Sequence, residues 1–326
     1  MIENSLHAPL RLVFMGTAEL ARESLRALAV AGRFEIAAVV SQPDRPSGRK
    51  LKLQPSPVKA LALELGLPVL QPDRARDAAF VDDLRALAPD LIVVAAYGQI
   101  LPKSILELPP LGCLNVHASL LPAYRGASPI QAAILNDDAK SGVTIMKMDE
   151  GLDTGDIVAM ESTPIASEDD AQSLHDRLAR IGGELLVRTI PDYANGELPP
   201  RPQPEEGVSH VGKIQKREGE IDWTQSARSI WCRVRAFTPW PGAYVWRGGG
   251  GGKRILKFWK TEVVDCAVDA SARPGEIVSA DKDGVVVACG RQALRIDVLQ
   301  PEGKRRMSAQ DFLLGHPLKP GGMISD

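Results

Sequence analysis

The fold is decided by one stretch, residues 10–41, which reads LRLVFMGTAELARESLRALAVAGRFEIAAVVS. Its first six residues form an apolar run that is typical of a buried strand, and Gly16-Thr17 predicts a turn. A helix over 18–30 and a second strand over 35–41 follow. A strand, a turn, a helix and a strand in this order begin a parallel, doubly wound sheet.

The same alternation continues downstream. The run 91–96 (LIVVAA) is apolar throughout, as expected for a central strand that helices cover on both faces. Further strands are predicted at 68–70, 113–118, 143–148 and 156–165, and helices at 57–65, 76–87, 129–135 and 171–193. We therefore predict an α/β, doubly wound, Rossmann-like catalytic domain over residues 1–194.

The composition changes after this region. The segment 195–207 (NGELPPRPQPEEG) is rich in proline, glycine and charge, which predicts an extended linker, taken here as 195–211. A helix over 224–237 is then followed by short alternating segments that turn residues separate. Strands at 243–246, 255–259, 275–279, 285–288 and 294–299 suggest a small OB-like β-barrel domain over 212–326.

Charge divides along the same line. The whole chain has 39 basic and 41 acidic side chains, which is close to neutral. Residues 1–206 have 20 basic and 28 acidic side chains, a net charge of −8, whereas 207–326 have 19 and 13, a net charge of +6. An acidic part joined to a basic part at Gly207 indicates two bodies with different partners.

The remaining composition excludes several classes of protein. No apolar run approaches the roughly 20 residues of a membrane span, and the start MIENSLH lacks the features of a signal peptide. The four cysteines (Cys113, Cys232, Cys266 and Cys289) are far apart, which argues against a zinc site or a disulfide framework. We expect a cytoplasmic location, where thiols stay reduced.

Two glycine motifs of nucleotide binding are missing. A dinucleotide fingerprint needs G-x-G-x-x-G, and Ala18 stands where the second glycine would let the backbone approach a pyrophosphate. The chain contains neither a P-loop nor a G-x-S-x-G nucleophile elbow. A plain strand-to-helix turn is therefore favoured over a site for NAD.

The loop 42–52 (QPDRPSGRKLK) follows the second strand, at the carboxyl edge where open sheets bind ligands. Its four basic side chains are Arg45, Arg49, Lys50 and Lys52. They fit either an arm that contacts phosphates or a solvated surface loop, and the loop alone does not decide between the two.

Two polar side chains stand together on a predicted strand. Asn115 and His117 are two residues apart, so they point to the same side, just before the strand ends. Such groups are costly to bury without partners, and we favour a functional role over a structural one. The turn 151–156 (GLDTGD) offers Asp153, which fits either an orienting partner for a histidine or a local cap.

The carboxyl-terminal part combines basic and aromatic residues. Lys213 follows the linker, and Lys304, Arg305 and Arg306 form a cluster. Most of the five tryptophans fit core packing, and the charges fit either a solvated face or an electrostatic patch for a polyanion.

Together, these motifs resemble the folate-dependent formyltransferase family, and the resemblance runs from about residue 10 to about residue 318. The motifs that resemble it are Asn115-x-His117-x-Ser119-Leu120-Leu121-Pro122, Arg125-Gly126 and Gly151-Leu152-Asp153-Thr154-Gly155-Asp156. The loop Gln42-Pro43-Asp44-Arg45 and the segment 238–244 are similar to those of family members that act on an aminoacylated tRNA. Residues 1–9 and the glycine run 248–252 match no motif of the family.

The resemblance implies a reaction. The formyl group of 10-formyltetrahydrofolate passes to the α-amino group of methionine on initiator tRNA, by a monomer that uses no metal. It implies Asn115, His117 and Asp153 as catalytic residues. The implied folate contacts are Ser119, Leu120, Leu121, Pro122, Tyr97 and Gly98. The implied tRNA contacts are Arg45, Arg49, Lys50, Lys52, Lys213, Lys304, Arg305 and Arg306.

Three alternatives remain from the sequence. A formyltransferase for a purine-pathway amine or an amino sugar would use the same three catalytic residues, although a small acceptor needs no basic second domain. A folate or nucleotide binder without catalysis is disfavoured by intact Asn115, His117 and Asp153. An NAD oxidoreductase is disfavoured by Ala18.

Overall fold

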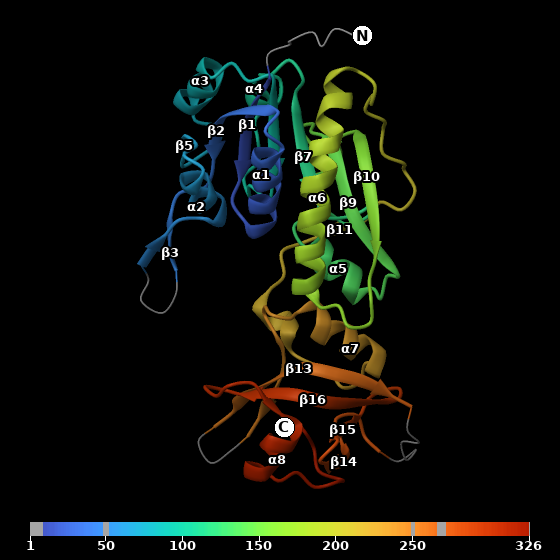
Figure 1. Cartoon of the computed structure of the whole chain (residues 1–326). Coiled ribbons are helices and arrows are strands. Elements are labelled where there is room, and N and C mark those ends of the chain that lie inside the picture. Colours follow the sequence, from blue (N-terminus) through green and yellow to red (C-terminus); the bar gives the residue numbers. More distant parts are fainter. Residues whose placement is uncertain (1–8, 48–51, 249–251, 266–271, 326) are drawn as a thin grey trace. The chain divides into compact units, whose positions relative to one another are not determined.

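The computed structural model describes residues 9–47, 52–248, 252–265 and 272–325 (Figure 1). The chain forms two compact units. Unit 1 consists of Met1–Pro129, Lys140–Pro164 and His175–Val211, and unit 2 consists of Ile130–Ala139, Ile165–Leu174 and Gly212–Asp326.

Unit 1 is built on a mixed sheet of seven strands in the order β10-β9-β7-β6-β1-β2-β5. Five of them run parallel: β1 (Leu10–Gly16), β2 (Phe34–Val40), β5 (Val69–Leu70), β6 (Leu91–Ala95) and β7 (Cys113–His117). The other two extend the sheet beyond β7: β9 (Lys140–Lys147) pairs antiparallel with β7, and β10 (Ile157–Pro164) pairs antiparallel with β9. The predicted doubly wound α/β class is confirmed, and the antiparallel edge adds to it.

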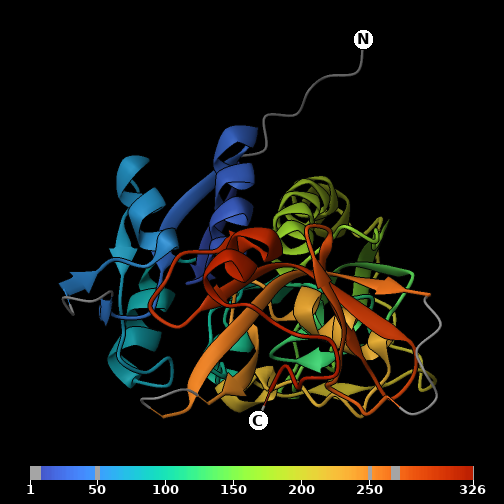
Figure 2. The same ribbon diagram turned by 90° about the horizontal axis from the view of Figure 1, so that it is seen from below.

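Helices cover both faces of this sheet. On one face lie α1 (Glu19–Ala31), α2 (Pro57–Glu64) and α6 (Ala171–Ala194), and Figure 2 shows α1 beside α6. On the other lie α3 (Ala78–Ala86) and α4 (Lys103–Leu106), over a core that contains Val13, Phe80 and Ile105. Because β6 is covered on both faces, all five of its residues are buried. The helix α5 (Pro129–Leu135) follows β7 in the chain.

The strand order places a ligand site by topology. Along the chain, the sheet grows outward from β1 through β2 to β5 and then returns to β6 on the other side of β1. The chain after β1 leads to α1 on one face of the sheet, whereas the chain after β6 leads to α4 on the other face. The loops at the carboxyl ends of these two neighbouring strands therefore diverge. Ligands of open α/β sheets bind at such a switch point. The carboxyl end of β7, with His117 as its last residue, lies next to it.

Two short ladders stand apart from the main sheet. In the basic loop, β3 (Arg45–Ser47) pairs antiparallel with β4 (Lys52–Gln54), so that this loop is a hairpin. The second ladder joins β8 (Arg125–Gly126) to β11 (His210–Val211) in parallel. The sequence analysis specified neither ladder, because each strand has only two or three residues.

The segment 195–211, expected to be an extended linker, is attached to unit 1. Arg201 exchanges two backbone hydrogen bonds with Ile157, at 2.8 and 2.9 Å, and Val211 pairs with Gly126. The prolines in this segment keep it from forming a longer ladder, since proline has no N–H to donate. The segment contains turns at 195–198 and 205–207, and it forms hydrogen bonds with Ile157, the first residue of β10, and with the loop that follows β7.

Unit 2 is an antiparallel sheet in the order β12-β13-β16-β15-β14, with β17 on β16, and the predicted carboxyl-terminal β domain is confirmed. Its strands are β12 (Ala243–Arg247), β13 (Arg254–Val264), β14 (Ile277–Asp281), β15 (Gly284–Ala288), β16 (Ala293–Pro301) and β17 (Met307–Ser308). A 3₁₀ turn, η1 (Lys216–Gly219), and the helices α7 (Ala227–Ala236) and α8 (Ala309–Gly315) accompany it. The core includes Trp223, Phe258 and Ile296.

One close contact fixes how α6 lies on the sheet. A β-carbon added to Gly182 would come within 2.9 Å of Val116 Cγ1 in β7. The next residue, Gly183, has the same relation to Ala27 of α1, also at 2.9 Å. The two glycines therefore let α6 approach both β7 and α1 more closely than side chains would allow.

The substitution Gly182→Leu tests this packing. The added side chain has to displace Val116, and we expect the free energy of unfolding to fall by about 1–3 kcal/mol, as for other overpacked cores. Thermal unfolding followed by circular dichroism measures the change. The matched control is Glu184→Leu, which adds a leucine on the exposed side of α6 and should shift stability by no more than about 0.5 kcal/mol. Equal stability of the two variants would contradict the close contact.

Candidate active site

Three polar side chains meet beyond the carboxyl end of β7. Asn115 and His117 are buried, with 9% and 6% of their surfaces exposed. Asn115 Nδ2 lies 3.5 Å from Asp153 Oδ1, and His117 Nδ1 lies 3.7 Å from Asp153 Oδ2. The structure thus brings together the three residues that the sequence analysis had selected from two separate motifs.

The tautomer of His117 follows from its second partner. Its Nε2 is 3.0 Å from the carbonyl oxygen of Tyr124. Because a carbonyl oxygen only accepts hydrogen bonds, Nε2 carries the hydrogen and Nδ1 faces the carboxylate of Asp153. A proton added to Nδ1 would create an imidazolium directly beside that carboxylate.

Asp153 is held in an unusual backbone conformation. Its φ of +53° lies in the left-handed region, which Asp tolerates better than most residues. The amide N–H of Gly126 donates to Asp153 Oδ2 at 2.8 Å, and this bond joins the turn 151–156 to the loop after β7. Gly155 permits the turn, because a β-carbon there would lie 1.9 Å from the carbonyl oxygen of Lys147.

The loop after β7 is stabilised by internal hydrogen bonds. Thr144, fully buried on β9, donates from its hydroxyl to the Ser119 carbonyl at 2.7 Å and accepts from the Leu121 amide at 3.1 Å. The Ser119 hydroxyl donates to the Ala123 carbonyl at 2.6 Å. Leu120 packs over Gly142, and Pro122 follows Leu121 in a cis peptide bond. The four predicted folate-binding residues therefore lie in a loop that begins directly after His117 and is held in place by these contacts.

At the end of β6, a buried tyrosine is followed by an exposed glycine. The Tyr97 side chain packs in the core, where burial raises the pKa of its hydroxyl to about 12. Its carbonyl accepts from Thr17 Oγ1 at 3.0 Å and from Gln42 Nε2 at 2.8 Å. Gly98 follows with a φ of +82°. The side chains of Thr17 and Gln42 therefore join the backbone at the end of β6 to the ends of β1 and β2.

The root of the basic hairpin is anchored. Asp44 accepts from Lys59 Nζ at 2.8 Å, and this hydrogen bond is the main cause that lowers the pKa of Asp44. Because this pKa is below its unfolded value of about 3.9, the stabilisation is present above that pH and is lost as the pH falls through the lowered pKa. Arg45 is exposed and donates to Gln42 Oε1 at 2.9 Å.

Arg49 and Lys50 lie outside the described residues, and Lys52 is described only through its place in β4.

The basic residues of unit 2 fall into two groups. Lys213, Lys304, Arg305 and Arg306 are exposed, and the Arg306 guanidinium stacks 3.4 Å from the ring centroid of Trp259. The arginines of α7 instead make contacts inside unit 2. Arg228 binds the Asp137 carboxylate with two hydrogen bonds of 2.7 and 2.8 Å, and Arg235 donates to the carbonyls of Asp169 and Ala166. Arg228 is exposed as well, but its guanidinium is paired with a carboxylate, so the first group is the one that can meet a polyanion.

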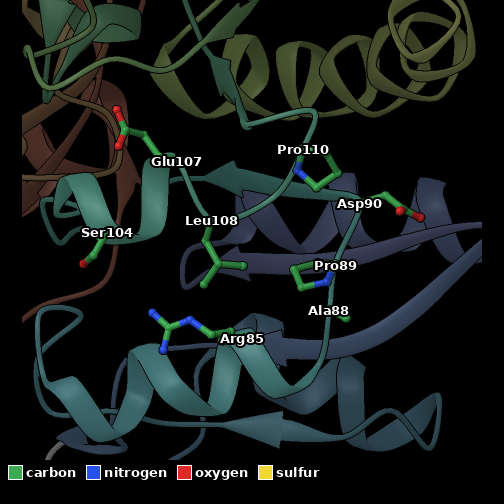
Figure 3. A pocket seen from close by; sticks show the side chains of 8 residues that line it. All are labelled: Arg85, Ala88, Pro89, Asp90, Ser104, Glu107, Leu108 and Pro110. Atoms are coloured by element: carbon green, nitrogen blue, oxygen red, sulfur yellow. The ribbon is translucent and has the colours of Figure 1, made fainter.

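A surface pocket of unit 1 lies elsewhere. Its lining includes Ala88, Pro89 and Asp90, which precede β6, so the pocket is at the amino end of that strand (Figure 3). None of the predicted site residues lines it. We place the candidate site at the carboxyl ends of the strands, because the buried polar side chains converge there.

The structure adds groups that the sequence analysis missed. They are the Tyr124 carbonyl, the Gly126 amide, the Thr144 hydroxyl and the Gln203 side chain. The first two are backbone groups, which no residue type reveals. Gln203 had one signal: it is a polar residue between two prolines, in a segment that would otherwise need no fixed side chain.

The hydrogen bonds of Thr144 can be tested by comparing a valine substitution there with the same substitution at Thr261. Thr144→Val keeps the shape but leaves a buried carbonyl and a buried amide without a partner, so we expect a loss of about 1–3 kcal/mol in stability. The control is Thr261→Val, since the buried Thr261 hydroxyl has no hydrogen-bond partner within the described ranges. Denaturant unfolding measures both, and a neutral Thr144→Val would show that the loop does not depend on this hydroxyl.

Among the helices of the described residues, none combines the length and apolar character that a membrane span requires. The three described cysteines, Cys113, Cys232 and Cys289, are buried thiols, and burial raises the pKa of Cys113 and Cys289 to about 12. Cys266 lies outside the described residues.

Comparison with known proteins connects both units to one family. Residues 10–190 match the formyl transferase family model, and residues 213–317 match the model of the formyl transferase C-terminal domain. The chain is 47% identical over 315 residues to the methionyl-tRNA formyltransferase of Citrifermentans bemidjiense, covering 97% of this chain and 96% of the relative. It is 49% identical over 311 residues to that of Myxococcus xanthus, covering 95% and 96%.

Similarity of fold extends to more distant proteins. HypX from Aquifex aeolicus, solved in complex with tetrahydrofolic acid, aligns with a TM-score of 0.62 at 17% identity. The alignment covers 94% of this chain and 47% of HypX, so the chain spans about half the length of that protein.

Proposed function

This chain belongs to the formyl transferase family, among its methionyl-tRNA formyltransferases, and from that premise we propose the reaction and the roles of its residues. It transfers the formyl group of 10-formyltetrahydrofolate to the α-amino group of methionine on initiator tRNA. The observation that supports this proposal most directly is the cluster of Asn115, His117 and Asp153 at the carboxyl edge of the sheet.

Asn115 and His117 stabilise the oxyanion of the reaction. When the amine attacks the formyl carbon, the carbonyl oxygen gains negative charge, and donors aimed at it are the largest catalytic factor. Within the described residues, the side chain of Asn115 makes one hydrogen bond, to Asp153, so that a second N–H is left for the substrate. The Nε2–H of His117 exchanges the neutral Tyr124 carbonyl for the oxyanion, with which a hydrogen bond is stronger.

Asp153 orients His117 and transfers a proton during the reaction. Its carboxylate lies 3.7 Å from His117 Nδ1 and keeps the other ring nitrogen, Nε2, on the side of the reacting carbonyl. In the tetrahedral adduct, the new C–N bond leaves the attacking nitrogen with an extra proton. Asp153 accepts this proton and passes it to N10 of the folate as the C–N10 bond breaks. The α-amine has a pKa of about 7.7–8.0, so a weak base is sufficient.

The folate lies along the loop after β7 and the end of β6. Ser119, Leu120, Leu121 and Pro122 form one side of its site, and the backbone at Tyr97 and Gly98 forms the other. Main-chain groups suit a pterin, whose ring edge presents several hydrogen-bond donors and acceptors. No metal takes part in this proposal.

The tRNA is held by basic side chains of both units. The hairpin supplies Arg45, Arg49, Lys50 and Lys52, and unit 2 supplies Lys213, Lys304, Arg305 and Arg306. We divide the chain into a catalytic domain (1–194), a connecting segment (195–211) and a tRNA-binding domain (212–326), and we take the enzyme to be a cytoplasmic monomer. The net charge of +6 on residues 207–326 supports the assignment of the third part.

Formylation of methionyl initiator tRNA in the presence of 10-formyltetrahydrofolate tests the activity, with formylmethionine as the product. We expect His117→Asn to lower kcat by about 10²–10³-fold, as the loss of an oxyanion donor does elsewhere. The control is His175→Asn, a histidine on α6 outside the site. If the unaltered chain formed the product and His117→Asn turned over at a near-normal rate, the proposed activity would be correct. The proposed mechanism would then be wrong.

Replacement of Lys304, Arg305 and Arg306 by alanine tests the tRNA contact. If each cation neutralises one phosphate, the slope of log affinity against log salt should become shallower by about 2–3. The control removes the same charge from Arg273, Lys282 and Lys319 of unit 2. Filter binding at several salt concentrations gives the slopes, and equal slopes in both triple variants would make the cluster an ordinary surface.

A further inference from the structure

Gln203 connects the two loops that form the candidate site. Its Nε2 donates to the carbonyl oxygen of Asp153 at 2.8 Å and to that of Gly155 at 2.7 Å. Its Oε1 accepts from Arg125 Nε at 3.1 Å and from Arg125 Nη2 at 2.7 Å. Both hydrogens and both lone pairs of the amide are therefore used.

The chemistry of the partners sets the orientation of this amide. A guanidinium offers only donors, and the two carbonyls offer only acceptors. If the amide were flipped, its NH₂ group would face the guanidinium and its oxygen would face the two carbonyls, and no hydrogen bond could form. Only one orientation is therefore allowed. Among the standard side chains of this length, only glutamine combines an acceptor with two donors on one rigid plane.

The backbone on both sides of Gln203 is fixed as well. Arg201 pairs with Ile157, while Ser209 Oγ accepts from the Tyr124 amide at 2.8 Å and the Ser209 carbonyl accepts from the Arg125 amide at 2.9 Å. Pro202 and Pro204 restrict the residues before them to extended conformations. The backbone that carries Gln203 is therefore anchored by hydrogen bonds at Arg201 and Ser209, which suits a group that positions another residue.

The contacts of Gln203 converge on Asp153. One of them holds the carbonyl of Asp153, whose backbone is left-handed, and another holds Gly155 two residues on. Through Arg125, the same amide reaches the loop whose next residue, Gly126, donates to the Asp153 carboxylate. The main chain and the side chain of Asp153 are thus both tied to Gln203.

We propose that Gln203 is the positioning residue of the active site, which sets the place of the Asp153 carboxylate relative to His117 and Asn115. It touches no reacting atom and acts through the turn 151–156. The inference rests on the proposed function for its kinetic consequence, whereas its structural part stands on the hydrogen bonds alone.

Three variants separate the two hydrogen bonds that the Gln203 amide donates (its donor arm) from the two that it accepts. Gln203→Met removes all four hydrogen bonds at similar length. Gln203→Glu keeps the acceptor for Arg125 but turns a carboxylate oxygen toward the carbonyls of Asp153 and Gly155. Glu205→Met, at an exposed position of the same segment, is the matched control.

Steady-state kinetics on the full chain give the first readout. In both Gln203 variants, we expect kcat to fall by about 10–100-fold, as a misplaced catalytic group does, with KM for methionyl-tRNA within about twofold. The control should keep the kcat of the unaltered chain. Normal kcat in Gln203→Glu would show that the donor arm is not needed, and a change confined to KM would make Gln203 a substrate contact; either result overturns the proposal.

Amide hydrogen exchange gives a second readout that needs no turnover. The Gly126 amide reports the place of the Asp153 carboxylate, because it donates to Oδ2. We expect it to exchange about tenfold faster in Gln203→Met than in Glu205→Met. Unchanged protection of Gly126 would overturn the proposal, even in a chain that formylated no tRNA, whereas faster exchange in such a chain would uphold the positioning and reject the proposed function.

Discussion

The Asp153 carboxylate is the group on which the arrangement of the site depends. It is only 14% exposed, and a charge in such a place needs donors around it. The donors are the Asn115 side chain at the end of β7 and the backbone amide of Gly126 in the following loop, and His117 Nδ1 lies 3.7 Å from the same carboxylate. Remove the carboxylate, and the groups that surround it have no common partner.

The strand β7 serves the core and the site at the same time. Alternation along a strand sends Val116 to the face where α6 packs and sends Asn115 and His117 to the other. Gly182 therefore packs against the residue between Asn115 and His117, on the face of β7 opposite to this polar pair. A residue change in α6, on the opposite face from the polar pair, can move the candidate site through a single side chain.

The regular elements were predictable because they have long patterns. The runs that became β1, β6 and α6 are apolar at a period of two or 3.6 residues or throughout, and each was expected within a few positions of its observed bounds. The short ladders β3–β4 and β8–β11 were missed, since two or three residues cannot show a period.

The candidate site was predictable only in part. Asn115 and His117 could be selected because two polar side chains near the end of a buried strand are unusual, whereas Asp153 was selected through the resemblance to the family, since Asp is common in tight turns. The catalytic role of all three residues stays a prediction. The position of Gln203 between two prolines did not reveal its role, because its four hydrogen bonds depend on contacts with residues about 50 and 78 positions away in the chain. The net charge of residues 207–326 also does not show which basic side chains could bind a polyanion. Arg228 and Arg235 contribute to this charge but already have partners within unit 2.

The attachment of 195–211 bears on how the molecule can be cut into parts. A fragment that ended at residue 194, where the last long helix stops, would lose Gln203, the Ser209 groups that hold Tyr124 and Arg125, and the strand that pairs with Gly126. Such a fragment would keep all three candidate catalytic side chains and still lack the frame around them. The smallest piece with an intact site therefore extends to Val211.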